Sequence, residues 1–203
     1  MKTFTWKRLA MVLTGLLGMG VFMSFLIKVS YGTDTYSYMC LAISNSTGLS
    51  YGTCSLLING SLFIPVVIFN RRLIHIGTIL NTFFVGYVID FCMMLETKFI
   101  PGWVFTAMPA RPIVFVAALI PFLAAAALYM NADMGLSAYD ALPKMITDWT
   151  KLPYFAVRIA WDGLTIAVGL VLREKLPLGT IVLALTIGPA VSIVGRWVKK
   201  MIE

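Results

Sequence analysis

Apolar stretches of about 20 residues recur along this chain, and their length constrains the fold more than any other feature. They cover residues 8–28, 50–69, 76–96, 112–131, 154–172 and 178–198. Each stretch is long enough to cross the hydrocarbon core of a bilayer, which is about 30 Å thick, because an α-helix rises about 1.5 Å per residue. The sequence therefore predicts an all-α polytopic membrane protein with six transmembrane helices.

The composition supports a single membrane domain over residues 1–203. Hydrophobic residues make up 60% of the chain, charged residues only 12%, and the mean hydropathy is +0.89. Soluble domains contain about 25% charged and about 45–50% apolar residues. The first stretch follows the basic residues Lys2, Lys7 and Arg8. It is longer than the core of a cleaved signal peptide (about 7–15 residues) and lacks a small-residue cleavage site, so we expect it to remain as the first span.

The two halves of the chain match each other at a separation of about one hundred residues. The aligned pairs are Gly32 with Gly135, Tyr36 with Tyr139, Leu49 with Leu152, Tyr51 with Tyr154, and Gly60 with Gly163. Once one residue is dropped from the next loop, Gly-Thr-Ile at 77–79 aligns with 179–181, and Gly86 with Gly188. Each half holds three spans, an odd number, so the halves insert in opposite directions. The sequence predicts two inverted three-helix repeats, about 8–96 and 112–198, as in many secondary transporters.

A short segment follows the first span of each repeat, at 34–46 and 137–149. About 13 helical residues reach only ~20 Å, which is too short to cross the bilayer core. Asp34 and Ser137 occupy equivalent positions and are good helix N-caps. One interpretation is a pair of re-entrant half-helices whose N-terminal ends face a midplane cavity and favour an anionic group. The alternatives are amphipathic helices in the interface, or two further spans that would make the repeats parallel.

Basic residues predict the orientation of the spans. With the N-terminus inside, the cytoplasmic side holds Lys2, Lys7, Arg8, Arg71, Arg72, Lys144, Lys151, Arg196, Lys199 and Lys200, and the opposite side holds Lys28, Lys98, Arg111, Arg173 and Lys175. That is ten against five, with Arg158 left within a span, and it favours both termini in the cytoplasm. The net charge of +7 is thus explained by orientation, and no nucleic-acid partner is expected because no basic soluble face is present.

Ionisable residues at membrane depth are candidates for function, because each costs about 2.5–3.5 kcal/mol on insertion scales. Asp162 lies midway along the fifth span, and Arg158 precedes it by one helical turn. The residue equivalent to Asp162 in the first half is Asn59, and a glycine follows both. Two interpretations stay open: an ion pair that only packs, or polar groups that converge on a solute or ion site where the halves meet.

Small and hydroxylated residues recur every fourth position in the third and sixth spans. They are Thr78, Thr82, Gly86 and Asp90 in one half, and Thr180, Ala184, Gly188 and Ser192 in the other. Such a stripe permits close helix packing in lipid. It is alternatively the polar lining of a permeation path, to which Asn81 and Asp90 would contribute. Gly15, Gly18 and Gly20 in the first span are interpreted as a further packing face.

These patterns resemble one known family. The Gly-Thr-Ile openings, the Gly-x-x-x-Tyr before each short segment and the stretch IGTILNTFFVGYVIDFCM are similar to bacterial YczE/YyaS-type integral membrane proteins, relatives of the YitT group. The resemblance covers roughly residues 10–198. The second half departs from it, with Ser192 where Asp90 stands and Pro189 where Tyr87 stands. The resemblance implies a protein of the bacterial cytoplasmic membrane that is suspected of transport, and it carries over no substrate.

An enzyme is not expected. The single histidine, His75, has no acidic neighbour, and Asp162-Gly163 lacks the later aspartates of a CDP-alcohol phosphotransferase motif. The cysteines Cys40, Cys54 and Cys92 have no metal-binding spacing and are interpreted as small buried hydrophobes. We therefore predict no cofactor and no metal site.

The predicted function is transport of a small solute by alternating access between the repeats. Contacts with the solute or a coupling ion are expected from Asn59, Asp90, Arg158 and Asp162, and from the half-helix N-termini at Asp34 and Ser137. The alternatives are a substrate-binding subunit of a multi-component importer and an accessory or scaffold membrane protein. The expected partners are the bilayer and the solute. The glycine-rich first span offers a face for a homodimer, while the sequence specifies no oligomeric state.

Overall fold

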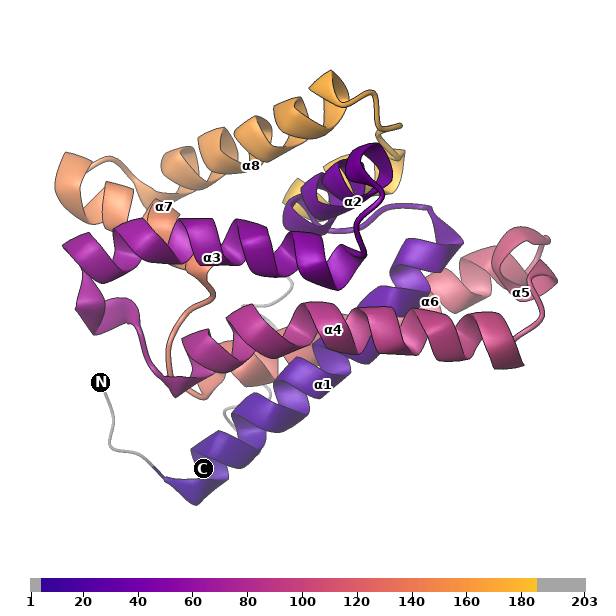
Figure 1. The fold of residues 1–203 in the computed structure, drawn as a ribbon, viewed down its shortest axis with the longest axis horizontal. Helices are drawn as coiled ribbons and strands as arrows, with labels where there is room; N and C mark the ends of the chain where they lie inside the picture. The colour runs from indigo at the N-terminus through magenta and orange to yellow at the C-terminus, as the bar shows by residue number, and fades with distance from the viewer. Residues whose placement is uncertain (1–4, 186–203) are drawn as a thin grey trace.

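The computed structural model describes residues 5–185, and this part of the chain is built from helices joined by short loops (Figure 1). The elements are α1 (Trp6–Val29), α2 (Thr35–Thr47), α3 (Tyr51–Phe69), the 3-10 turn η1 (Arg71–Leu73), α4 (Ile76–Phe99), α5 (Trp103–Thr106), α6 (Ala110–Asn131), α7 (Ala138–Thr150) and α8 (Tyr154–Val171). Residues 178–185 are also helical.

Five of the six expected spans are confirmed as long apolar helices. These are α1, α3, α4, α6 and α8, with 18 to 24 residues each. The expected sixth stretch, 178–198, continues beyond the described residues. Gly188, Pro189 and Ser192 lie outside them. The large apolar side chains of the spans face outward, as Phe83, Phe84 and Phe91 of α4 do with more than half of their surface exposed. Such a surface suits lipid rather than water, so the chain is a membrane-embedded, multi-pass protein.

The long helices alternate in direction (Figure 1). The start of α1, the loop from α3 to α4 and the loop from α6 to α7 lie at one end of the molecule, and α5 lies at the other. This alternation places each connecting loop at an end of the bundle, where a bilayer would leave it in water.

The glycines of α1 form a packing face inside the chain. A Cβ atom at Gly15 or Gly18 would come within 2.9 Å of Tyr129 or 2.8 Å of Ala125 on α6, and one at Gly20 within 2.5 Å of Val88 on α4. The packing role expected for these glycines is therefore confirmed, and small residues explain the close approach. Because α6 and α4 already cover this face, a homodimer would have to use a different surface.

The two short helices pack across the halves of the chain. Helix α2 lies against α8, and α7 lies against α3. Part of the apolar side of α7, expected to face the membrane interface under one interpretation, is buried: Leu142 and Met145 form a cluster with Val66 of α3. The charged side of α7 stays exposed, where Lys144 and Asp148 form an ion pair of 3.8 Å. Protein thus covers the apolar side of α7 at Leu142 and Met145, whereas Trp149 near its end is 55% exposed.

Matching loop glycines make reciprocal contacts between the halves. The N–H of Gly77 donates to the carbonyl of Met134 (2.9 Å), and the N–H of Gly179 donates to the carbonyl of Tyr31 (3.1 Å). The residues after these carbonyls are Gly135 (φ +109°) and Gly32 (φ +150°), conformations that favour glycine. The aligned glycines therefore make the same hydrogen bond in both halves, and each bond joins one half to the other.

Candidate functional site

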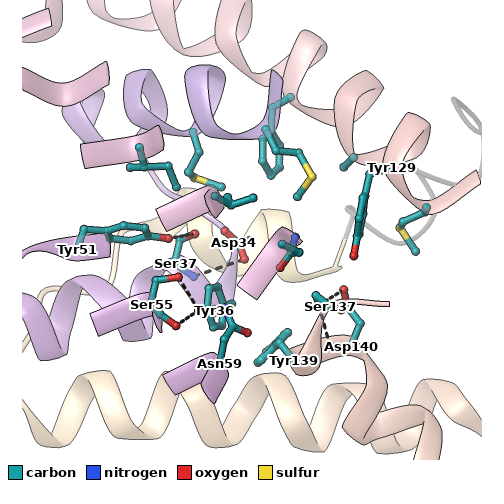
Figure 2. A pocket seen from close by; sticks show the side chains of 18 of the residues that line it. Asp34, Tyr36, Ser37, Tyr51, Ser55, Asn59, Tyr129, Ser137, Tyr139 and Asp140 are labelled. Atoms are coloured by element: carbon teal, nitrogen blue, oxygen red, sulfur yellow. Dashed lines mark hydrogen bonds between the residues drawn. The ribbon is translucent and has the colours of Figure 1, made fainter. Parts of the chain in front are cut away.

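The first turns of α2 and α7 converge on one cavity. Each helix begins at an N-cap side chain: the carboxylate of Asp34 accepts from the N–H of Ser37 (3.4 Å), and the hydroxyl of Ser137 accepts from the N–H of Asp140 (3.0 Å). Such caps satisfy the free N–H groups of a first turn. Figure 2 shows side chains from both first turns around the same space.

The cavity has a volume of about 140 Å³ and a mixed lining. Helices α1, α4 and α6 supply mainly apolar side chains: Met19, Met23, Val85, Ile89, Phe122, Ala126 and Met130. The remaining lining is polar or aromatic: Asp34, Tyr36, Ser37, Tyr51, Ser55, Asn59, Asn81, Tyr129, Ser137, Tyr139, Asp140 and Arg158. A single water needs only about 10–15 Å³ of such volume, so the space admits a small solute or several waters.

A neutral cluster forms one part of the wall, in the first half of the chain. The hydroxyl of Tyr36 donates to the backbone carbonyl of Ser55 (3.2 Å) and accepts from the side-chain amide of Asn59 (2.5 Å). Asn59 is only 3% exposed. This arrangement fixes the amide of Asn59 through its nitrogen and leaves its oxygen for other partners.

A charged cluster forms the matching part in the second half. The hydroxyl of Tyr139 donates to one carboxylate oxygen of Asp162 (2.6 Å), and the hydroxyl of Thr35 donates to the same oxygen (2.8 Å). The guanidinium of Arg158 binds the other oxygen of Asp162 (3.1 Å) and also a carboxylate oxygen of Asp140. One arginine is therefore shared between two carboxylates.

The two clusters occupy aligned positions and touch each other. Tyr36 aligns with Tyr139, and Asn59 aligns with Asp162. The rings of the two tyrosines lie 5.1 Å apart between centroids, tilted by 54°. In each cluster the tyrosine hydroxyl binds the polar residue that sits midway along the neighbouring span. The centre of the molecule is thus a contact between two equivalent tyrosine-centred units.

Two buried oxygens at the cavity lack a hydrogen-bond partner among residues 5–185. They are Oδ1 of Asp34 and Oδ1 of Asn59. Burial raises the pKa of the Asp34 carboxyl above its ordinary 3.8, and the hydrogen bonds from Ser37 oppose that rise. Buried polar atoms in proteins are nearly always paired, so these two oxygens point to a partner that the described part of the chain does not supply.

The structure brings together five of the six residues proposed from sequence. Asn59, Arg158, Asp34 and Ser137 line the cavity, and Asp162 lies behind it, bound to Arg158 and Tyr139. Asp90 lies elsewhere.

The carboxylate of Asp90 accepts from the N–H of Gly52 (2.9 Å) in the first turn of α3. A carboxylate is stabilised there by the helix dipole. At this contact a Cβ atom on Gly52 would come within 2.9 Å of the backbone of Gly86, so Asp90 secures the close packing of α3 on α4.

Sequence reasoning missed the four tyrosines and Asp140 as lining residues. The alignment of Tyr36 with Tyr139 was the signal for two of them, since aligned polar-aromatic residues beside the half-helix N-termini belong at the same place. Tyr51 was also aligned, with Tyr154, which is not among the lining residues, and Asp140 follows the predicted N-cap Ser137 by three residues. Tyr129 carried no local signal. Over residues 5–185, no group of three or more His, Cys, Asp or Glu side chains is arranged to hold a metal ion.

Comparison with protein families gives one match. The model of a family of unknown function, DUF6198, matches residues 6–196 and so includes every element that builds the cavity. The chain belongs to DUF6198. No curated protein and no solved structure matches it. The DUF6198 match names no YczE/YyaS-type protein, so the resemblance to that group stays a prediction.

Proposed function

We propose that this DUF6198 protein is a small-solute transporter of the bacterial cytoplasmic membrane, built from two inverted three-span repeats with both termini in the cytoplasm. The observation that carries the proposal is the cavity at the contact between Tyr36 and Tyr139. Transporters with inverted repeats bind their solutes at such a repeat interface, between discontinuous helices whose N-termini point at the site.

The reciprocal contacts support the inverted arrangement. The pairs Gly77–Met134 and Gly179–Tyr31 repeat one hydrogen bond with the halves exchanged. The packing of α2 on α8 is likewise repeated by α7 on α3. The proposal adds a sixth span over 178–198, which gives each repeat an odd number of crossings.

The polar contacts suggest where movement would occur. Arg158 binds Asp140 and Asp162 within the second half, so α7 and α8 are tied together. The hydrogen bond from Thr35 to Asp162 and the tilted ring contact of Tyr36 with Tyr139 join the two halves. Alternating access would break and remake the contacts between halves while the ion pairs within the second half persist.

Uptake into liposomes tests the proposal. The purified protein is reconstituted, a mixture of small metabolites is added outside, and the trapped solutes are identified by mass spectrometry. We expect enrichment of one solute class, reduced at least tenfold by Asp162→Asn, which weakens the bond to Arg158 by more than about 1.4 kcal/mol. The matched control is Asp148→Asn, an exposed carboxylate on α7 away from the cavity.

Other outcomes would contradict this function. Uptake that appears only after an added ATPase subunit would identify the protein as the substrate-binding subunit of an importer. Absence of any solute enrichment, with a correctly folded protein, would favour the accessory or scaffold alternative. Uptake that is unchanged by Asp162→Asn would remove Asp162 from the mechanism.

A further inference from the structure

The cavity wall contains free hydrogen-bond acceptors, whereas its tyrosine hydroxyls already donate to other atoms of the chain. The four lining tyrosine hydroxyls each donate to an atom of the chain: Tyr36 to the carbonyl of Ser55, Tyr51 to the hydroxyl of Ser37, Tyr129 to the carbonyl of Gly77, and Tyr139 to Asp162. The hydroxyl of Ser137 donates to Asp140. By contrast, Oδ1 of Asp34 and Oδ1 of Asn59 are buried without a donor from residues 5–185. A solute that satisfies them must bring N–H or O–H groups.

The charge at the cavity is negative. Among residues 5–185, three carboxylates, Asp34, Asp140 and Asp162, stand against the guanidinium of Arg158, which leaves a formal charge of −2 for these four side chains. Two of these carboxylates bind that guanidinium. Asp34 is the acidic residue that has no basic partner among the described ion pairs at the cavity.

The helix N-termini do not alter this conclusion. The first turns of α2 and α7 would attract an anion if they were vacant. Asp34 caps one of them, and Asp140 lies in the first turn of the other. The protein therefore supplies the anions itself, which argues for a cationic ligand in place of the anionic group that the sequence suggested.

The aromatic lining suits a cation as well. Four tyrosines, Tyr36, Tyr51, Tyr129 and Tyr139, line the cavity. Aromatic faces attract cations, and the attraction rises to about 2 kcal/mol in sites that exclude water. Methionines and Phe122 complete a wall that accepts a short apolar chain.

We propose that this cavity binds small solutes that carry a protonated primary amine. The ammonium group would donate to Oδ1 of Asp34 and Oδ1 of Asn59 beside the tyrosine faces, and the organic part would lie against α1 and α6. An ammonium has three donors and no acceptor, which complements a site rich in free acceptors. This inference rests on the proposed function and names the class of its solute.

Ligand-dependent thermal stabilisation of the purified protein tests the inference. The probes are propylammonium, 1-propanol and propionate, which share their size and differ in charge. A ligand that binds the folded state at one hundred times its Kd stabilises it by about 2.7 kcal/mol, which appears as a rise in Tm. We expect propylammonium to raise Tm and the other two probes to raise it little. Tetramethylammonium, which has no N–H donor, should bind at least tenfold more weakly than propylammonium.

Two variants locate the effect. Asp34→Asn keeps an N-cap side chain on α2, because asparagine caps as well as aspartate. Asn59→Leu keeps the volume and removes the free oxygen. Each is expected to weaken propylammonium binding about tenfold or more, whereas Asp148→Asn leaves it unchanged. Gel filtration establishes that each variant is folded, and either variant alone suffices for the comparison.

The results that would contradict the amine-binding proposal differ from those that would contradict the transport proposal. Equal or larger stabilisation by propionate or 1-propanol would overturn the amine class, and so would no stabilisation by propylammonium or undiminished binding in both variants. None of these results would contradict the proposed transport function, because the uptake experiment with the metabolite mixture tests transport of any solute class. Uptake of an anionic or neutral solute would thus refute this inference and support transport.

Discussion

The neutral cluster around Tyr36 and the charged cluster around Tyr139 occupy matching places in the two halves. Both use a tyrosine hydroxyl to hold a polar residue midway along a span. In the first half that residue is Asn59, which needs no counter-ion. In the second half it is Asp162, which is bound by Arg158 and Thr35. The comparison teaches that one scaffold position supports two chemistries, and that charge in a membrane requires a larger set of partners.

The largest difference between the clusters should appear when the arginine is removed. Arg158→Leu leaves Asp140 and Asp162 without their cation, and breaking a buried ion pair costs about 3–5 kcal/mol. We expect the low end, about 3 kcal/mol, because a quarter of the Arg158 side chain stays exposed. Asn59→Leu, the counterpart in the neutral cluster, should cost only about 1 kcal/mol. Thermal unfolding in detergent measures both, and equal losses would contradict the distinction.

The loop glycines test whether the halves are equivalent. Ala at Gly32 would place a Cβ atom 2.4 Å from the backbone of Thr180, and Ala at Gly135 would place one 2.4 Å from the side-chain oxygen of Thr78. We expect each change to cost about 2 kcal/mol or more, since clash adds to an unfavourable φ. Gly48→Ala, with φ +74° and open space, is the control and should cost about 1 kcal/mol. A loss at only one of Gly32 and Gly135 would break the equivalence.

The tyrosine hydroxyls give a smaller effect that compares the clusters directly. Tyr139→Phe removes a hydrogen bond to a charged group, worth about 1.5–3 kcal/mol. Tyr36→Phe removes hydrogen bonds between neutral groups, worth about 0.5–1.5 kcal/mol. We expect Tyr139→Phe to lower Tm more than Tyr36→Phe. The reverse order would mean that Arg158 and Thr35 stabilise Asp162 without the Tyr139 hydroxyl.

A labelling experiment sharpens the comparison without a large effect on stability. In a background with Cys40, Cys54 and Cys92 replaced by serine or alanine, Arg71→Cys and Arg173→Cys are treated with a membrane-impermeant thiol reagent from outside the cell. We expect labelling of the Arg173→Cys variant only, because the proposed inverted arrangement would put the two loops on opposite sides. Labelling of the Arg71→Cys variant alone would reverse the proposed orientation, and labelling of both would refute the opposite placement.

Much of the fold was predictable because its signals are local. Five spans follow from apolar length, and α2 and α7 begin at their predicted caps, Asp34 and Ser137. The alignment of Asn59 with Asp162 also pointed to the centre of the molecule. These features depend on residues within a few turns of each other or on the internal match.

The remaining features depend on contacts between distant segments. The apolar side of α7 suits a membrane interface and a protein surface equally well, and only the proximity of Val66 on α3 decides between them. Asp90 was interpreted as a solute contact because it is acidic and within a span. Its partner is the N–H of Gly52, a backbone group that carries no sequence signal.

The exchange of short helices between the halves has a consequence for biogenesis. When the first 100 residues have left the ribosome, α2 has no α8 to cover it, and α3 has no α7. A newly inserted N-terminal half therefore presents unpaired polar groups to lipid until translation of the C-terminal half is complete. Chaperoning by the insertion machinery during that interval would be a requirement of this architecture, and truncated chains should be substrates for membrane proteases.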